Sequence, residues 1–227
     1  MALLEISQLR KSFAAPDGAE HCVVNIKDFT LDEHAHLALQ GESGCGKTTF
    51  LHLIAGILKP DAGTIRLAGA EMSALREPAR DRLRATTIGY IFQVFNLLQG
   101  YTCLENVLLG MSFGPGTDRA FAEALLKRVG LENRLHHYPR QLSTGQQQRG
   151  AVARALANRP KLVLADEPTG NLDHKNARES LTLIREACRE NGAALLLVSH
   201  DAGVLAQFEN VRDFSSINYT AEEPSRP

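Results

Sequence analysis

GESGCGKT, residues 41–48, matches the pattern G-x-x-x-x-G-K-[ST] in full. The apolar run Leu37–Leu39 precedes it, and apolar residues at helical spacing follow it over Lys47–Leu58, where Lys59-Pro60 stops the helix. A glycine-rich loop between a strand and a helix directs backbone amides and the positive end of the helix toward phosphate groups. The stretch therefore predicts a phosphate-binding site within an α/β fold, rather than a glycine-rich turn with a chance lysine.

The residues of this loop have different expected tasks. Lys47 is expected to pair with the β- and γ-phosphates of a nucleotide, and the Thr48 hydroxyl to bind Mg²⁺. Cys45 is interpreted as a small loop residue rather than a redox-active thiol. The other residues expected to contact the nucleotide are Gly41, Ser43, Gly44, Cys45, Gly46 and Thr49.

The composition is that of a globular protein. The chain has 227 residues, of which 44% are hydrophobic and 22% charged, and this allows a large buried core. Its 25 Lys and Arg are balanced by 26 Asp and Glu, so no overall basic field argues for nucleic acid as a partner. The four cysteines are too scattered for a disulfide framework, which favours a reducing, cytoplasmic setting.

From the sequence we expect neither a secretory signal nor a membrane-spanning segment. The opening MALLEISQLRKSF is predicted to be a strand rather than a secretory signal, because no basic segment precedes an apolar stretch. The longest apolar run, Ala193–Val198, is far shorter than the roughly 20 residues that span a bilayer, so we expect no membrane crossing. The tail TAEEPSRP, residues 220–227, is expected to be disordered.

Apolar runs alternate with helical patterns along the chain, which predicts a parallel sheet covered by helices. Besides Leu37–Leu39, strands are expected at Ile88–Phe92, Leu162–Ala165 and Ala193–Val198, and the last two are apolar enough to be buried on both faces. The residues up to Glu33, together with 64–67, predict an antiparallel side sheet with turns at 16–18 and 61–63.

The middle of the chain has a different character. From about Asn96 to Asn158 the strand pattern gives way to helical patterns, notably over 119–129 and 145–157. A helical insert is therefore expected at approximately 96–158, within one domain that spans residues 1–227.

LVLADEP, residues 162–168, ends an apolar strand in two carboxylates. Because ligands bind at the carboxyl ends of parallel strands, we expect Asp166 to hold the metal and Glu167 to accept a proton from an attacking water. The alternative is a solvated acidic turn. Gln93 and His200 also follow predicted strands and are expected to face the same crevice.

LSTGQQQRG, residues 142–150, contains the spacing of a capping box. In that motif Ser143 and Gln146 each satisfy a backbone donor at the start of a helix. Taken alone, the stretch predicts a helix start and nothing more.

Six motifs together identify a family. GESGCGKT, Gln93, LSTGQQQR, LVLADEP, GNLD at 170–173 and His200 resemble, in order and approximate spacing, the ATP-binding-cassette ATPases over almost the whole chain. The resemblance implies an α/β fold: a P-loop NTPase (RecA-like) core with an antiparallel β side sheet and a helical subdomain insert. It also implies ATP and Mg²⁺ as cofactors, and hydrolysis of ATP to ADP and phosphate coupled to transport.

The resemblance also assigns roles to residues. Ser143, Gly145 and Gln146 resemble the signature loop, which serves ATP bound on a second subunit, so a homodimer is implied. The helix start that the capping box holds can bind a γ-phosphate, which agrees with this role. Phe13 resembles the aromatic residue that stacks on adenine, although packing in the core would explain a phenylalanine at this position equally well. Gln93 resembles the residue that contacts Mg²⁺ and senses the helical insert. Asp173 resembles the cross-dimer contact, and His200 the γ-phosphate switch. Catalysis is thereby expected from Lys47, Glu167 and His200, and metal binding from Thr48, Gln93 and Asp166.

One residue departs from the family pattern. The signature's usual second glycine is Thr144 in this chain. A first helical turn tolerates threonine and its amide stays available, so ATP binding is expected to survive.

The implied partner is a separate transmembrane permease, which would hold this ATPase as a peripheral subunit at the cytoplasmic side of the inner membrane. ADEPTGNLD and FNLLQGYTCLENVLLG resemble the branch that serves lipoprotein release and macrolide export, whereas amino-acid importers more often have a serine-alanine variant at 170–171. The alternatives are the ATPase of such an importer, a non-transport ATPase acting on DNA or ribosomes, and a small-molecule kinase. The short interval between Thr48 and Leu142 excludes the long coiled coils of chromosome-type members, and a kinase leaves LSTGQQQR and Glu167 unused.

The expected permease-facing surface is Val94–Leu104. In it Phe95, Leu97, Leu98 and Tyr101 form either an apolar groove or the insert's own core.

Overall fold

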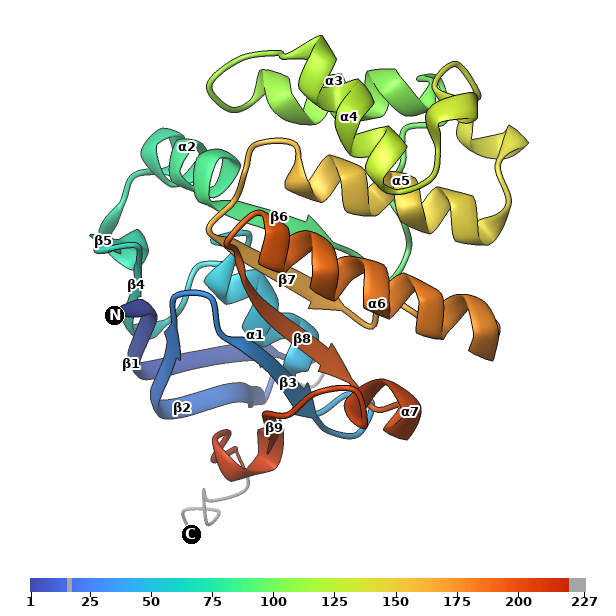
Figure 1. The fold of residues 1–227 in the computed structure, drawn as a ribbon. Helices are drawn as coiled ribbons and strands as arrows, with labels where there is room; N and C mark the ends of the chain where they lie inside the picture. The colour runs from blue at the N-terminus through green and yellow to red at the C-terminus, as the bar shows by residue number, and fades with distance from the viewer. Residues whose placement is uncertain (16–17, 221–227) are drawn as a thin grey trace, which may run out of the picture.

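A computed structural model describes residues 1–15 and 18–220 of the chain. Residues 16 and 17 of the expected turn, and 221–227 of the expected disordered tail, lie outside this range. The described chain forms two sheets, with helices packed against the larger one (Figure 1).

The larger sheet is parallel and has the order β6-β7-β8-β3-β9. Its strands are β3 (His36–Gln40), β6 (Ile88–Ile91), β7 (Leu162–Asp166), β8 (Ala194–Ser199) and β9 (Val211–Asp213). Every residue of β7 and β8 is buried, as their near-continuous apolar composition predicts.

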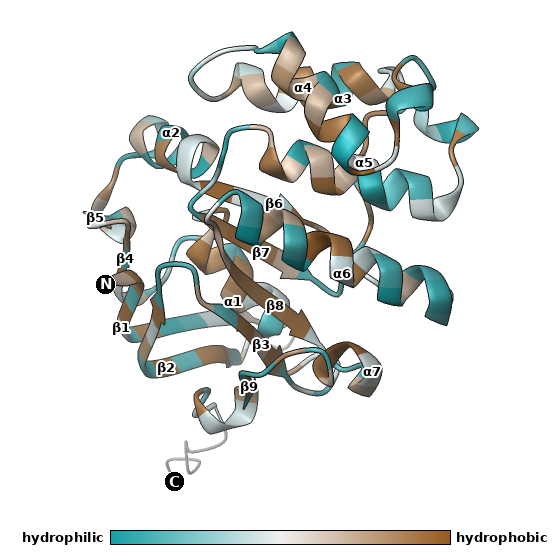
Figure 2. Ribbon diagram, in the orientation of Figure 1, coloured by the Kyte–Doolittle hydropathy of each residue, from teal (hydrophilic) through white to brown (hydrophobic). Residues whose placement is uncertain are grey.

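Alternate residues of these strands enter two different cores. Val163 and Leu195 belong to a core shared with the helical region, whereas Leu164 and Leu196 belong to one shared with the side sheet. Helix α1 (Lys47–Ile54) packs on the second face, and α6 (His174–Glu190) covers the first (Figure 1). In Figure 2 the hydrophobic colouring accordingly concentrates on the sheet, while the outer side of α6 is hydrophilic.

The smaller sheet is antiparallel, with the order β2-β1-β4-β5, in agreement with the expected side sheet. It consists of β1 (Ala2–Ala14), β2 (Glu20–Asp32), β4 (Ala62–Leu67) and β5 (Ala70–Glu71). Short 3₁₀ turns lie at η1 (Met72–Ala74), η2 (Glu132–Arg134), η3 (Pro139–Gln141) and η4 (Phe214–Ser216).

The segment between β6 and β7 is helical, as expected. It contains α3 (Cys103–Ser112), α4 (Arg119–Arg128) and α5 (Thr144–Leu156). Gly89 lets α5 approach β6 closely, because a Cβ there would lie 2.2 Å from the Ala155 carbonyl oxygen. Helix α7 (Ala202–Leu205) follows β8.

Two helices differ from the sequence expectation. Helix α1 ends at Ile54 rather than Leu58, because Gly56 takes a φ of 64° and the Ile57 and Leu58 amides turn back to donate to the His52 carbonyl. Helix α2 (Glu77–Thr87) was not predicted, and it buries only Thr87, so it lacks the apolar periodicity by which a helix is recognised.

Within the described residues, no helix combines the length and apolarity that crossing a membrane requires.

Candidate functional site

The loop 41–48 wraps around the N-terminus of α1, and two of its glycines have backbone angles that side chains rarely adopt. Gly44 has a φ of 82° and Gly46, the residue that begins the helix, has 102°. A Cβ on Gly46 would lie 2.6 Å from the Val23 carbonyl oxygen. The loop therefore lies tightly against β2, and the free amides at the start of α1 are placed where they could bind an anion.

Lys47 packs against its own loop, and only 6% of its surface is exposed. Its Nζ donates to the carbonyl oxygens of Gly41 and Glu42, each at 2.7 Å, and lies 3.7 Å from Cys45 Sγ. The ammonium is thus positioned at the loop by three groups of the same turn, where it can neutralise phosphate charge.

The end of β7 brings a carboxylate to the start of α1. Thr48 Oγ1 donates to Asp166 Oδ1 at 3.1 Å. Burial raises the pKa of the Asp166 carboxyl above its usual range, and the hydrogen bond from Thr48 opposes that rise. A buried carboxylate beside a hydroxyl is an oxygen donor set that suits Mg²⁺, whose charge would favour the ionised form. The residues present therefore fit this ion.

Glu167 follows Asp166 in a strained conformation with a φ of 42°. Its Oε2 accepts a hydrogen bond from Ser199 Oγ at 3.1 Å, and its Oε1 lies 2.7 Å from His200 Nδ1. Ser199 Oγ in turn accepts from the Asp201 amide at 3.1 Å. Ser199 and His200 thus hold the carboxylate in an arrangement in which it could accept a proton, and the Asp201 amide fixes the Ser199 hydroxyl.

Gln93 reaches the same place from the loop after β6, and its backbone carbonyl accepts from Asn171 Nδ2 at 2.8 Å. All these groups line one cavity of about 270 Å³. Its lining comprises Val23, Ser43, Gly44, Gly46, Lys47, Thr48, Thr49, Gln93, Asp166, Glu167 and His200.

The structure brings together most of the expected site but not all of it. Gly41 and Cys45 line a neighbouring hollow of about 430 Å³, which shares His200 with the main cavity. Phe13 lies on β1 with 41% of its surface exposed and does not line the cavity. The ring of Phe13 instead has Lys11 Nζ 5.5 Å from its centroid.

The signature stretch lies away from the cavity, at the start of α5. Ser143 caps the helix through both bonds of the capping box: its Oγ accepts from the Gln146 amide at 3.3 Å, and Gln146 Oε1 accepts from the Ser143 amide at 3.0 Å. Thr144 is the first residue of the helix. The predicted helix start is present, and none of its residues lines the cavity at the chain's own phosphate loop.

A second helix start lies beside it. Asp173 caps α6 by accepting from the amides of Lys175 at 3.1 Å and Asn176 at 3.0 Å. A Cβ on Gly145 would lie 3.3 Å from Asn176 Oδ1, so the two capped ends are neighbours.

Two residues of the site were not predicted: Val23, which lines the cavity, and Ser199, which donates a hydrogen bond to Glu167. Val23 lies in a strand that carries no motif. Its place at the cavity becomes evident only from its close contact with Gly46 in the folded chain. Ser199 stands at the end of a buried strand, directly before His200, and that placement was the available signal.

These features define the class of protein: a P-loop nucleotide-binding fold whose parallel sheet ends in a buried acid, hydrogen-bonded to the start of α1, and a second acid held by its neighbours. The chain belongs to the ABC transporter family, whose model matches residues 24–170. It is an ATPase of that family, in which hydrolysis of ATP is coupled to transport.

Curated relatives are similar over most of the chain. The "Lipoprotein-releasing system ATP-binding protein LolD" of Shewanella sp. (strain MR-4) is 41% identical over 211 residues, 91% of this chain and 90% of the relative. The protein of the same name from Pseudomonas syringae pv. tomato is 42% identical over 215 residues, 92% of this chain and 93% of the relative.

Solved structures are similar in fold. The "Dimeric Structure of MJ0796, a Bacterial ABC Transporter Cassette" matches with a TM-score of 0.83 and 33% identity, over 92% of each chain. A second structure, of a dimeric post-hydrolysis state of the same cassette bound to ADP and Pi, matches with a TM-score of 0.83 and 32% identity, also over 92% of each chain.

Proposed function

We propose that this chain is the ATP-hydrolysing subunit of a lipoprotein-releasing transporter. Two copies close around two ATP and drive a separate transmembrane permease, which holds them at the cytoplasmic side of the inner membrane. The observation that carries the proposal is the 41% identity to a LolD protein over 91% of the chain. The dimeric state of the similar solved cassettes supports the pairing of two copies.

The proposed chemistry begins with the grip on the triphosphate. Lys47 pairs with the β- and γ-phosphates, while the amides of the glycine-rich loop and of α1 surround them. Thr48 and Asp166, with the side chain of Gln93, would hold Mg²⁺, which supplies neutralisation of the phosphate charge. The hydrogen bond between Thr48 and Asp166 keeps both oxygens at one point of the cavity.

Hydrolysis requires a base at the γ-phosphate end. Glu167 is proposed to orient the attacking water and accept its proton, since its carboxylate is held from two sides by Ser199 and His200. His200 is proposed to contact the γ-phosphate. Its contact with Glu167 would couple this phosphate contact to the proposed base.

The second half of each site comes, in this proposal, from the partner copy. Ser143, Gly145 and Gln146 present a capped helix start, and Asp173 caps a neighbouring one. A helix N-terminus attracts a γ-phosphate, so a second copy would close on ATP from the opposite side. Loss of the γ-phosphate then weakens the contact between the copies. Phe13, exposed on β1, is proposed to stack on adenine.

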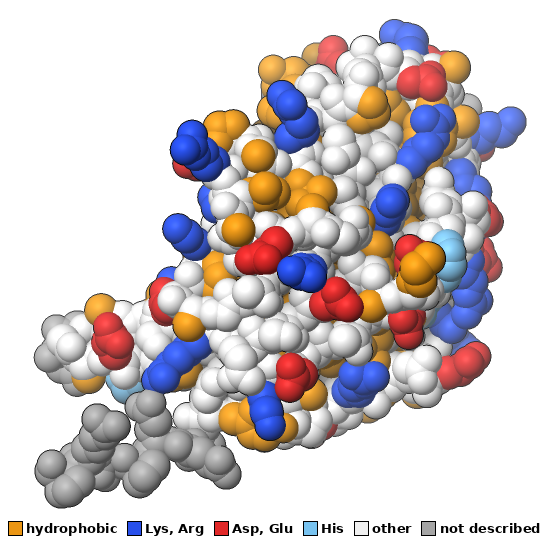
Figure 3. All heavy atoms as spheres, turned by 90° about the vertical axis from the view of Figure 1, so that its left-hand side faces the viewer, with side chains coloured by type: hydrophobic (Ala, Val, Ile, Leu, Met, Phe, Trp, Pro, Cys, Tyr) orange, Lys and Arg blue, Asp and Glu red, His pale blue; other side chains and the backbone are white. Residues whose placement is uncertain are grey.

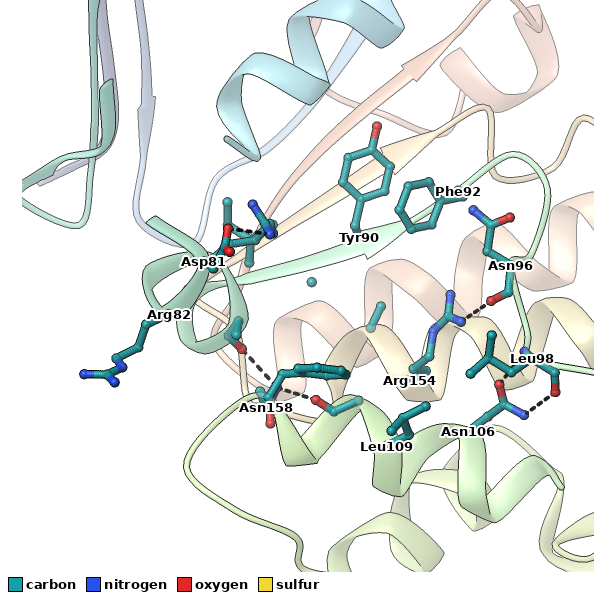
Figure 4. A pocket seen from close by; sticks show the side chains of 17 residues that line it. Asp81, Arg82, Tyr90, Phe92, Asn96, Leu98, Asn106, Leu109, Arg154 and Asn158 are labelled. Carbon is teal, nitrogen blue, oxygen red and sulfur yellow. Dashed lines mark hydrogen bonds and ion pairs between the residues drawn. The ribbon is translucent and has the colours of Figure 1, made fainter. Parts of the chain in front are cut away.

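A groove of about 820 Å³ is the proposed site for the permease. Figure 4 shows it between β6, α3 and α5, and Figure 3 shows hydrophobic side chains gathered in a hollow of the face that carries α2. Tyr90, Phe92, Leu98, Leu109 and Phe113 supply apolar lining. The expected surface 94–104 is therefore divided: Leu97 and Leu104 are buried in the core, whereas Leu98 lines the groove.

Arg154 connects this groove to the nucleotide site. From α5 its guanidinium donates to the carbonyl oxygens of Phe95, at 3.0 Å, and of Asn96, in the loop that follows Gln93 (Figure 4). Displacement of the helical insert, proposed to span approximately residues 96–158, would then move the Gln93 loop with it.

The proposal is tested by reconstitution. The chain, co-expressed with the transmembrane subunits of a lipoprotein-releasing system, should co-purify with them and transfer a lipoprotein from liposomes to a soluble acceptor on addition of ATP. Leu98→Asp should abolish co-purification while ATP binding by the isolated subunit persists. Isolation of the chain on a permease that moves amino acids, or on ribosomes, would overturn the proposal.

A further inference from the structure

The last described residues of the chain pass behind the phosphate loop. Phe214, at the start of η4, is fully buried, and its ring centroid lies 5.6 Å from that of Phe50 in α1. A Cβ on Gly41 would lie 3.4 Å from Phe214 Cβ. The segment that begins at Phe214 therefore packs against the start of the phosphate loop and against helix α1, which follows the loop.

Asn218 is the polar centre of this segment and is only 8% exposed. Its Nδ2 donates to the carbonyl oxygens of Val23 at 3.0 Å and Cys45 at 3.3 Å, and its Oδ1 accepts from the Asn25 amide at 2.7 Å. One side chain thus joins β2 to the phosphate loop with both amide hydrogens and its oxygen in use.

The bond to Cys45 bears on the phosphate site directly. The Cys45 carbonyl and the Gly46 amide belong to the same trans peptide, in which the C=O and the N–H point in opposite directions. Holding the carbonyl toward Asn218 therefore holds the amide hydrogen toward the other side of the loop. Gly46 lines the nucleotide cavity, and so does Val23, the other residue whose carbonyl Asn218 binds.

Glycine makes such a constraint necessary. Gly46 has a φ of 102° and no side chain to restrict rotation of the adjoining peptide planes. Without a donor at the Cys45 carbonyl, the peptide would sample orientations in which its amide no longer faces a bound phosphate.

We infer that Asn218 is a positioning residue for ATP binding, which fixes the phosphate-loop peptide between Cys45 and Gly46 from outside the nucleotide cavity. It acts on the affinity for phosphate-bearing nucleotides and not on the chemical step, because none of its bonds reaches Asp166, Glu167 or His200.

The test compares three full-length variants. Asn218→Ala removes all three bonds, and Asn218→Asp keeps the acceptor for the Asn25 amide while losing both donors. Ser216→Ala is the matched control in the same segment, since the Ser216 hydroxyl donates to the Asp213 carbonyl at 2.7 Å, a contact within the segment that does not involve the phosphate loop.

We expect the Kd for ATP and for ADP, measured by fluorescent-nucleotide competition, to rise about tenfold in both Asn218 variants and to stay within about twofold in the control. KM for ATP should rise in parallel, while kcat at saturating ATP stays within about twofold. A purely structural anchor would instead lower the thermal midpoint and leave the Kd of the folded fraction unchanged.

Either of two results would overturn the inference: unchanged nucleotide affinity in both Asn218 variants, or a loss confined to kcat. If Asn218→Ala does not fold, Asn218→Ser decides by the same measurements, since its hydroxyl retains a donor and is expected to give an intermediate Kd.

Discussion

Glu167 combines an unfavourable backbone conformation with well-defined side-chain contacts. A φ of 42° at a residue with a Cβ costs about 1–2 kcal/mol, and the hydrogen bond from Ser199 and the contact with His200 hold the side chain in place. Strain of this kind persists where surrounding structure enforces it, and here it aims a carboxylate into the cavity.

Glu167→Gln tests the base directly. The amide keeps the size of the side chain but cannot accept the proton of water, so we expect ATP binding to persist and kcat to fall by a factor of about 10²–10⁴. Steady-state phosphate release and nucleotide binding are the two measurements. Rapid hydrolysis by this variant would remove Glu167 from the role of base.

Thr144→Gly tests the departure from the family pattern. Thr144 is the first residue of α5, where its amide is free and its side chain forms no part of the capping box. We expect ATPase activity to be retained or raised by no more than about threefold, with a loss of stability of about 0.5–1 kcal/mol from the added backbone freedom. Complete loss of activity would show that this loop works differently.

At the scale of elements, the contact between α5 and β6 determines where the helical region sits. Gly89 is the residue that allows it, since the Ala155 carbonyl occupies the position that a side chain would need. The same helix carries Ser143 at its start and Arg154 near its end, so its placement on the sheet sets the position of both.

Gly89→Ala should therefore displace α5. A Cβ at 2.2 Å from a backbone oxygen forces the strand or the helix to move, and we expect a loss of about 1–3 kcal/mol in the free energy of unfolding. Urea denaturation measures it. Gly100→Ala is the matched control, because nothing lies within 4 Å of a Cβ there, and an equal loss in both variants would contradict the packing argument.

At the scale of the whole molecule, the two capped helix starts at Ser143 and Asp173 are adjacent to each other and outside the cavity. One copy therefore presents two neighbouring helix starts that do not line its own nucleotide cavity, and we propose that they bind phosphate on a second copy. In the proposed dimer each pair of helix starts would contact the nucleotide bound to the other copy, so closure would depend on ATP.

The pairing has a measurable consequence. In the Glu167→Gln background, ATP should shift the isolated subunit from monomer to dimer in light scattering coupled to gel filtration. Adding Ser143→Ala removes the cap, which weakens the helix start by about 1 kcal/mol, and should reduce the dimer fraction without changing ATP binding to the monomer. A strictly monomeric Glu167→Gln protein with bound ATP, also in its membrane complex, would contradict the model.

The local sequence determined the phosphate loop, the acids after β7, the capping box at Ser143 and the alternation of strands and helices. Each depends on residues that are neighbours in the chain, where spacing alone fixes which groups meet. The end of α1 was predicted wrongly, at Leu58 rather than Ile54, because Gly56 ends the helix before Pro60 is reached.

The tertiary structure alone decided which distant groups share the site. Val23 and Asn218 reach the phosphate loop, and Ser199 reaches the Glu167 carboxylate, through contacts with residues far along the chain, and no spacing in the sequence records those contacts. The reason is physical: a hydrogen bond requires two groups about 3 Å apart, and for residues on different elements only the packing of the sheets and helices sets that distance.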